Sequence, residues 1–85
     1  MVVKDIVLSF LRTKNNIPGE SETEQLACEY LDHGILDSLG IVEMVAEFER
    51  ILNIRFSAED MQSEEFRTIG GLILLIENLR KAGTL

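Results

Sequence analysis

The sequence is poor in the residues that build disulfides and metal centres. It has one cysteine, Cys28, and one histidine, His33, among 85 residues. A lone cysteine forms no intramolecular disulfide, and a lone cysteine with a lone histidine completes no zinc or iron ligand set. We therefore expect neither a disulfide framework nor a metal, and a reducing cytoplasm is the expected location.

Helix breakers and long apolar runs are also scarce. The sequence has one proline, Pro18, no tryptophan, and few β-branched residues in alternating order, which favours helices over a sheet. The longest apolar run late in the chain, Leu72 to Ile76, is too short to span a bilayer. The segment from Met1 to Asp5 carries charges, unlike a cleavable secretory signal. We expect one small helical domain over residues 1–85, a monomer without a membrane span.

Basic residues are also few relative to acidic ones. Fifteen acidic residues stand against eight basic ones, which leaves a net charge of −7. Such a charge repels nucleic acid and anionic lipid and attracts basic patches on protein partners, so no nucleic-acid binding is expected. The same excess also keeps a small protein soluble, so by itself it does not establish a binding function.

The apolar residues that are present recur at helical spacing in four segments. The sequence predicts three main helices and one short one: a helix from Val3 to about Lys14, a second from about Ser38 to Leu52, a short third beginning at Ser57, and a fourth begun by Thr68 and followed by Gly83. A long connection over residues 15–37 carries its own apolar anchors and is expected to pack, with a short helix between Thr23 and Leu31. Gly70-Gly71 predicts either close packing of another helix or fraying there.

The second predicted helix has two distinct faces. Its buried stripe is expected to hold Ile41, Val45, Phe48 and Leu52, with Val42 beside it. A charged stripe of Glu43, Glu47 and Arg50 lies opposite, with Leu39 at its edge. An exposed leucine beside carboxylates is what a docking surface would present, although single surface leucines are common.

Ser38 stands where a loop gives way to this helix, and three roles are open to it. Serine is a common helix N-cap, which is the ordinary interpretation of Asp-Ser before an apolar-periodic segment. A nucleophilic serine would need a nearby base and a pocket, and Gly-x-Ser-x-Gly is absent because Leu36 and Gly40 flank Ser38, so an enzyme is not expected. A phosphodiester on Ser38 would be stabilised by free N–H groups and the helix dipole.

The segment Asp37-Ser38-Leu39, followed by Val42-Glu43-Met44 and Glu47-Phe48-Glu49, resembles the phosphopantetheine-attachment motif of acyl and peptidyl carrier proteins. The resemblance covers nearly the whole chain. It implies an all-α, right-handed four-helix bundle of the acyl-carrier type, with three main helices, one short helix and a long first loop.

The resemblance also implies a site and its partners. 4′-Phosphopantetheine would be attached to Ser38 by a separate holo-synthase, a phosphopantetheinyl transferase, and Asp37 would aid that transferase in metal binding. Cargo would ride on the arm as a thioester. Partner-binding residues would be Leu39, Glu43, Met44 and Glu47, meeting basic docking patches on acyl- or aminoacyl-activating and transferring enzymes.

Two departures from the family pattern bear on the pathway. Gly40 follows Leu39 where fatty-acid carriers have an acidic residue, and Arg50 replaces another acidic residue. Gly34 to Ser38 and Glu64 to Thr68 look more like D-alanyl and other specialised stand-alone carriers. We expect an acyl carrier in a specialised branch of lipid or fatty-acid biosynthesis, cell-envelope modification or secondary metabolism. The alternatives are a D-alanyl or aminoacyl carrier, or an acidic helical interaction module without a prosthetic group.

Overall fold

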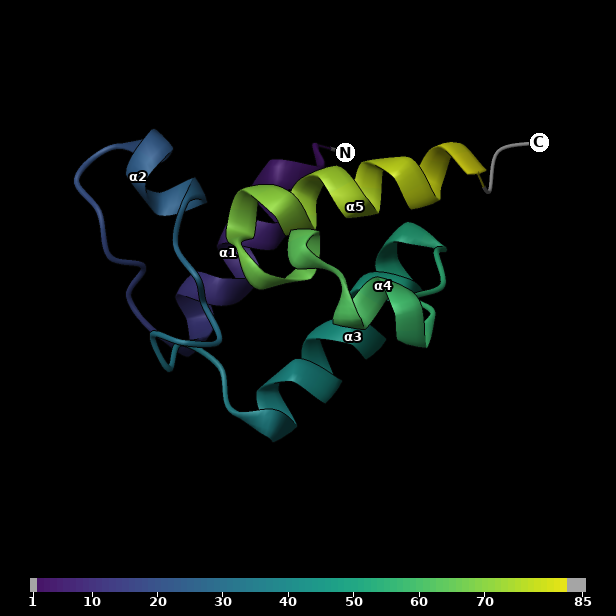
Figure 1. Cartoon of the computed structure of the whole chain (residues 1–85), viewed down its shortest axis with the longest axis horizontal. Coiled ribbons are helices and arrows are strands. Elements are labelled where there is room, and N and C mark those ends of the chain that lie inside the picture. The colour runs from purple at the N-terminus through teal and green to yellow at the C-terminus, as the bar shows by residue number, and fades with distance from the viewer. Residues whose placement is uncertain (1, 83–85) are drawn as a thin grey trace.

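The computed structural model describes residues 2–82 and contains no strand within that range (Figure 1). Its elements, in order along the sequence, are α1 (Val3–Lys14), α2 (Glu22–Leu26), α3 (Ser38–Leu52), α4 (Ala58–Gln62), the 3₁₀ helix η1 (Glu64–Arg67) and α5 (Ile69–Ala82). The all-helical prediction with three main helices is confirmed. Over the described residues, no helix is both long and apolar enough to cross a membrane.

The three long helices enclose the core, with α5 packed against α1, α2 and η1. Fully buried side chains come from every long helix: Val7 and Leu11 from α1, Met44 and Phe48 from α3, and Ile69, Leu72 and Ile76 from α5. No polar or charged residue is buried among those described. The hydrophobic effect of this one cluster is therefore the main source of stability.

The buried face of α3 differs from the predicted stripe. The residues that α3 buries are Gly40, Met44, Phe48 and Leu52, whereas Ile41 and Val45 are half-buried. Val42, expected beside the core, is 65% exposed. Both possible stripes contain Phe48 and Leu52, and the Phe48 ring packs edge-on against Phe10 of α1 with centroids 5.4 Å apart. Gly40 and Met44 complete the buried face of α3 with Phe48 and Leu52.

The connection between α1 and α3 packs as expected, but its helix is shorter than predicted. Ser21 caps α2, and the helix ends at Leu26 because the backbone then turns into the core. The Ile69 backbone N–H donates to the Cys28 carbonyl at 3.1 Å, and the buried Tyr30 hydroxyl donates to the Phe66 carbonyl. Burial raises the pKa of Tyr30 well above its usual range.

The other anchors of this connection are unequally buried. Ile35 and Leu36 lie in the core, Leu26 is half-buried, and Leu31 is exposed. Ile35 and Leu36 come just before Asp37, the N-cap of α3, so their burial fixes the start of α3 against the core.

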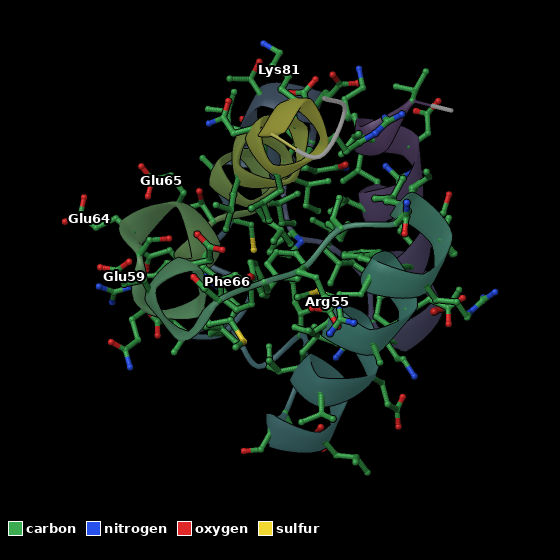
Figure 2. All side chains as sticks on the ribbon, turned by 90° about the vertical axis from the view of Figure 1, so that its right-hand side faces the viewer. Arg55, Glu59, Glu64, Glu65, Phe66 and Lys81 are labelled. Carbon is green, nitrogen blue, oxygen red and sulfur yellow. The ribbon has the colours of Figure 1, made fainter. Side chains whose placement is uncertain are left out.

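The short elements before α5 begin as the sequence predicts. Ser57 forms a capping box with Asp60 at the start of α4, and the Thr68 hydroxyl accepts from the Gly71 N–H at 3.0 Å. In Figure 2, Phe66 points into the molecule while the Glu64 and Glu65 side chains point away from it. The predicted stop signal at Gly83 lies outside the described residues.

Close packing, rather than fraying, explains the glycine pair. A Cβ on Gly71 would stand 2.4 Å from the Glu65 carbonyl oxygen, and one on Gly70 would stand 3.1 Å from the Leu26 carbonyl oxygen. Both glycines thus let backbone from α2 and η1 approach α5.

Candidate functional site

The candidate site is the amino-terminal end of α3, which Figure 1 shows at the lower edge of the molecule, where the segment from α2 enters the helix. Asp37 is the N-cap, with extended backbone, and its Oδ1 accepts from the Gly40 N–H at 2.7 Å. Ser38 is the first helical residue. The capping role considered for Ser38 is therefore wrong, because the preceding aspartate fills it.

The Ser38 side chain is left available by this arrangement. Ser38 is exposed, and its hydroxyl makes no hydrogen bond within residues 2–82. Over the same range, the backbone N–H groups of Ser38 and Leu39 also lack an acceptor, as is usual in the first turn of a helix. An anion attached to Ser38 would lie at the positive end of the α3 dipole, beside unpaired donors.

Gly40 lies in a crowded position at this helix start. It is buried, and a Cβ there would stand 3.1 Å from Leu36 Cδ2 and 3.2 Å from Asp37 Oδ1. Both contacts are tighter than most Cβ contacts, so a side chain would press on the very oxygen that caps the helix. An acidic side chain at position 40 would require Leu36 or Asp37 to shift.

A polar hollow of about 310 Å³ lies next to the cap, lined by Asp37, Leu39, Gly40, Glu43 and Lys14 among others. Across it, Lys14 Nζ of α1 lies 2.8 Å from Glu43 Oε2 of α3. Both side chains are partly exposed, and pairs of this kind contribute about 0–1 kcal/mol. The pair neutralises one of the carboxylates predicted to meet a partner.

Two of the four predicted partner-binding residues, Leu39 and Glu43, line the polar hollow beside the Asp37 cap. Leu39 is 66% exposed directly after Ser38. Glu43 is exposed, whereas Glu47 is half-buried against α1 and pairs with Arg50 one turn along.

Met44 does not belong to this surface. Its exposed fraction is 0%, so the expectation that it binds partners is wrong. It packs inward because it lies one turn from both Gly40 and Phe48 on the buried face.

Sequence reasoning assigned Val42 to the wrong face and so missed its place beside the site. It lies one turn after both Ser38 and Leu39, and with Leu39 it forms an exposed apolar pair. The i, i+3 spacing from Leu39 could have indicated that Val42 lies on the Leu39 side. The apolar stripe predicted from Ile41 to Leu52 favoured the other assignment.

Comparisons with known proteins agree with the geometry of this site. The family model for the phosphopantetheine attachment site matches residues 3–76. The D-alanyl carrier protein of Leuconostoc citreum is 30% identical over 79 residues, covering 93% of this chain and 97% of that protein. The D-alanyl carrier protein of Streptococcus equi subsp. zooepidemicus is 35% identical over 63 residues, covering 74% of this chain and 80% of that protein.

A third relative, D-alanyl carrier protein 1 of Lactiplantibacillus plantarum, is 28% identical over 80 residues, covering 94% of this chain and all of that protein. The predicted family, its prosthetic group and its non-catalytic character are confirmed. The chain belongs to the carrier proteins that bear a phosphopantetheine attachment site.

Proposed function

We propose that this protein carries D-alanine, or a similar small aminoacyl group, on 4′-phosphopantetheine attached to Ser38. The observation that carries the attachment site is the free, exposed Ser38 hydroxyl on the first residue of α3, with Asp37 supplying the cap. The choice of cargo is supported by relatives named as D-alanyl carriers, which favours the aminoacyl alternative over an acyl carrier of lipid synthesis.

The residues around Ser38 fit a phosphodiester. The free N–H groups of Ser38 and Leu39 and the helix dipole favour negative charge there by about 0.3–1 kcal/mol. Asp37 offsets part of this by repulsion, but one of its oxygens is engaged by Gly40. Its other oxygen has no partner in residues 2–82 and could join the metal site of a transferase bound to this end of α3.

The prosthetic group supplies a thiol that holds a carboxylic acid as a thioester, whose carbonyl is open to attack by an acceptor. The protein's own contribution is to present that group at the edge of the molecule, on a helix whose start is fixed by Leu36 and the Asp37 cap. Making a thioester from a free amino acid requires activation, so the partners proposed are a phosphopantetheinyl transferase and an aminoacyl-activating enzyme.

The surface offered to these partners is apolar at its centre and mixed in charge around it. Leu39 and Val42 give the apolar contact, while Glu43 and Glu47 hold intramolecular ion pairs. A partner's arginine can replace Lys14 or Arg50 at little energetic cost, because exposed pairs contribute about 0–1 kcal/mol. Partners with a mixed rather than purely basic patch are favoured, since Lys14 and Arg50 remain nearby.

The test has two steps. The purified protein is incubated with coenzyme A, Mg²⁺ and a promiscuous phosphopantetheinyl transferase, and its intact mass is measured beside that of Ser38→Ala. A gain of one phosphopantetheine by the wild type alone is expected. No gain on a folded wild-type protein would overturn the attachment site and leave an acidic interaction module.

In the second step, the modified protein receives D-alanine with ATP and a D-alanine-activating enzyme, and separately a fatty acid with an acyl-activating enzyme. A mass gain of one alanyl residue, removed by hydroxylamine, is expected. Efficient fatty-acyl loading without alanyl loading would contradict the proposed cargo and support an acyl carrier of lipid synthesis.

A further inference from the structure

A second concave surface lies between α1 and α3. It is a groove of about 430 Å³ lined by Asp5, Ile6, Ser9, Phe10 and Thr13 of α1 and by Glu47, Phe48 and Ile51 of α3. The Phe48 ring is fully buried beneath it, whereas Ile6, Phe10 and Ile51 are only partly covered. The volume lies within the range of pockets that hold a small molecule or a few side chains.

The ends of this groove carry one sign of charge. Asp5 of α1 and Glu47 of α3 line it, and no lysine or arginine among the described residues does. Asp5 forms no ion pair within the described residues, and Glu47 pairs only with the exposed Arg50. Lys14 lies with Nζ 5.5 Å from the Phe10 ring centroid, but it is held by Glu43. An apolar floor with two carboxylates complements a large apolar side chain flanked by basic ones.

The groove faces away from the candidate attachment site. Glu47 follows Ser38 by about two and a half turns of α3, so the two side chains leave opposite sides of the helix. Ile51 lies one turn further along the Glu47 side. A molecule seated between α1 and α3 would therefore cover Glu47 but leave Ser38, on the opposite side of α3, open.

We propose that this groove binds an amphipathic helical segment of a partner protein. The segment inserts a large apolar side chain over Phe10 and Ile51 and places arginine or lysine against Asp5 and Glu47. The groove exists whatever Ser38 carries. Its use, which rests on the proposed function, is to hold the carrier on a partner while the Ser38 side remains free to deliver cargo.

The probe is a synthetic amphipathic helix built of leucine and lysine, titrated into the unmodified, ¹⁵N-labelled full-length protein while amide NMR signals are recorded. Saturable shifts are expected at Ile6, Phe10, Thr13 and Ile51. The same peptide with glutamate in place of lysine should not bind, because Asp5 and Glu47 repel it.

Variants separate the groove from the general acidity of the protein. Ser9 is exposed at the groove, so Ser9→Trp fills it without removing a core side chain, and binding should weaken about tenfold or more. Asp5→Lys should weaken binding several-fold. Glu77→Lys makes the same charge change on the exposed side of α5, away from the groove, and should leave affinity nearly unchanged.

Three results would overturn the proposal. They are equal weakening by Asp5→Lys and Glu77→Lys, shifts centred on Leu39 and Val42, and the absence of saturable binding. Because the measurement uses the unmodified protein, its failure is distinct from a failure of Ser38 modification. Circular dichroism of each variant establishes that a loss of binding is not a loss of fold.

Discussion

The cap at the start of α3 predicts different effects on stability for substitutions of Asp37 and of its neighbour Ser38. Removing the Asp37 carboxylate by Asp37→Ala leaves the Gly40 N–H without its 2.7 Å partner, and losing such a cap costs about 1 kcal/mol. For a domain of this size, that loss lowers Tm by about 4–8 °C. The Ser38 hydroxyl makes no hydrogen bond within the described residues, so Ser38→Ala should change the free energy of unfolding by less than about 0.5 kcal/mol.

The assay is urea and thermal unfolding of the unmodified protein, followed by circular dichroism. Asp37→Asn is the matched control, since asparagine caps helices as well as aspartate does. It should keep most of the stability while slowing phosphopantetheine transfer if the charge serves the transferase. A Ser38→Ala variant destabilised as much as Asp37→Ala would refute the assignment of the cap.

Four further predictions concern the core. Tyr30→Phe leaves the Phe66 carbonyl without its donor and should lower the unfolding free energy by about 1–3 kcal/mol in urea titrations. Above about pH 10 the unfolded protein releases the Tyr30 proton, whereas the folded protein keeps it because the pKa of Tyr30 is raised. The free energy of unfolding of the wild type should therefore fall above that pH, and that of Tyr30→Phe should fall less. Equal alkaline profiles for the two proteins would contradict this. Gly71→Ala drives a Cβ against the Glu65 backbone and should cost about 1–3 kcal/mol by the same assay, with an unchanged midpoint counting against the close approach. Burial raises the pKa of the Cys28 thiol, so a disulfide reagent should modify it at the rate of unfolding rather than at the rate for a free thiol.

The order of helices was predictable because apolar residues recur at helical spacing and local signals mark several of the helix ends. Ser57 and Thr68 both cap the helices that follow them, and Lys14 ends α1 as predicted. These signals act over three or four residues, so the sequence alone contains them.

The inward face of α3 was not predictable from that helix alone. Apolar residues lie on both sides of Phe48, and either Ile41 or Met44 could begin a stripe that reaches Leu52. The choice depends on how α3 packs against the rest of the molecule, and the structure buries Met44 fully while Ile41 is half-buried. The misassignments of Met44 and Val42 both follow from choosing the stripe that begins at Ile41.

The candidate site was found by its residues, but its local geometry was not. Asp37-Ser38 contains two good capping residues in succession, and propensity does not distinguish them. The structure distinguishes them: the Asp37 carboxylate accepts from the Gly40 N–H and caps the helix, while the Ser38 hydroxyl stays free.

The hydrogen bond between Ile69 and Cys28, together with the buried Tyr30, ties the segment ahead of α3 to the start of α5. Under the proposed function, the flexible arm is therefore attached next to a segment that is fixed to the core, rather than to a mobile loop. Every enzyme that uses the cargo must bring its reaction centre within one arm's length of that single point. The distance between an enzyme's reaction centre and Ser38 therefore limits which enzymes can use the cargo, before the chemistry of their active sites matters.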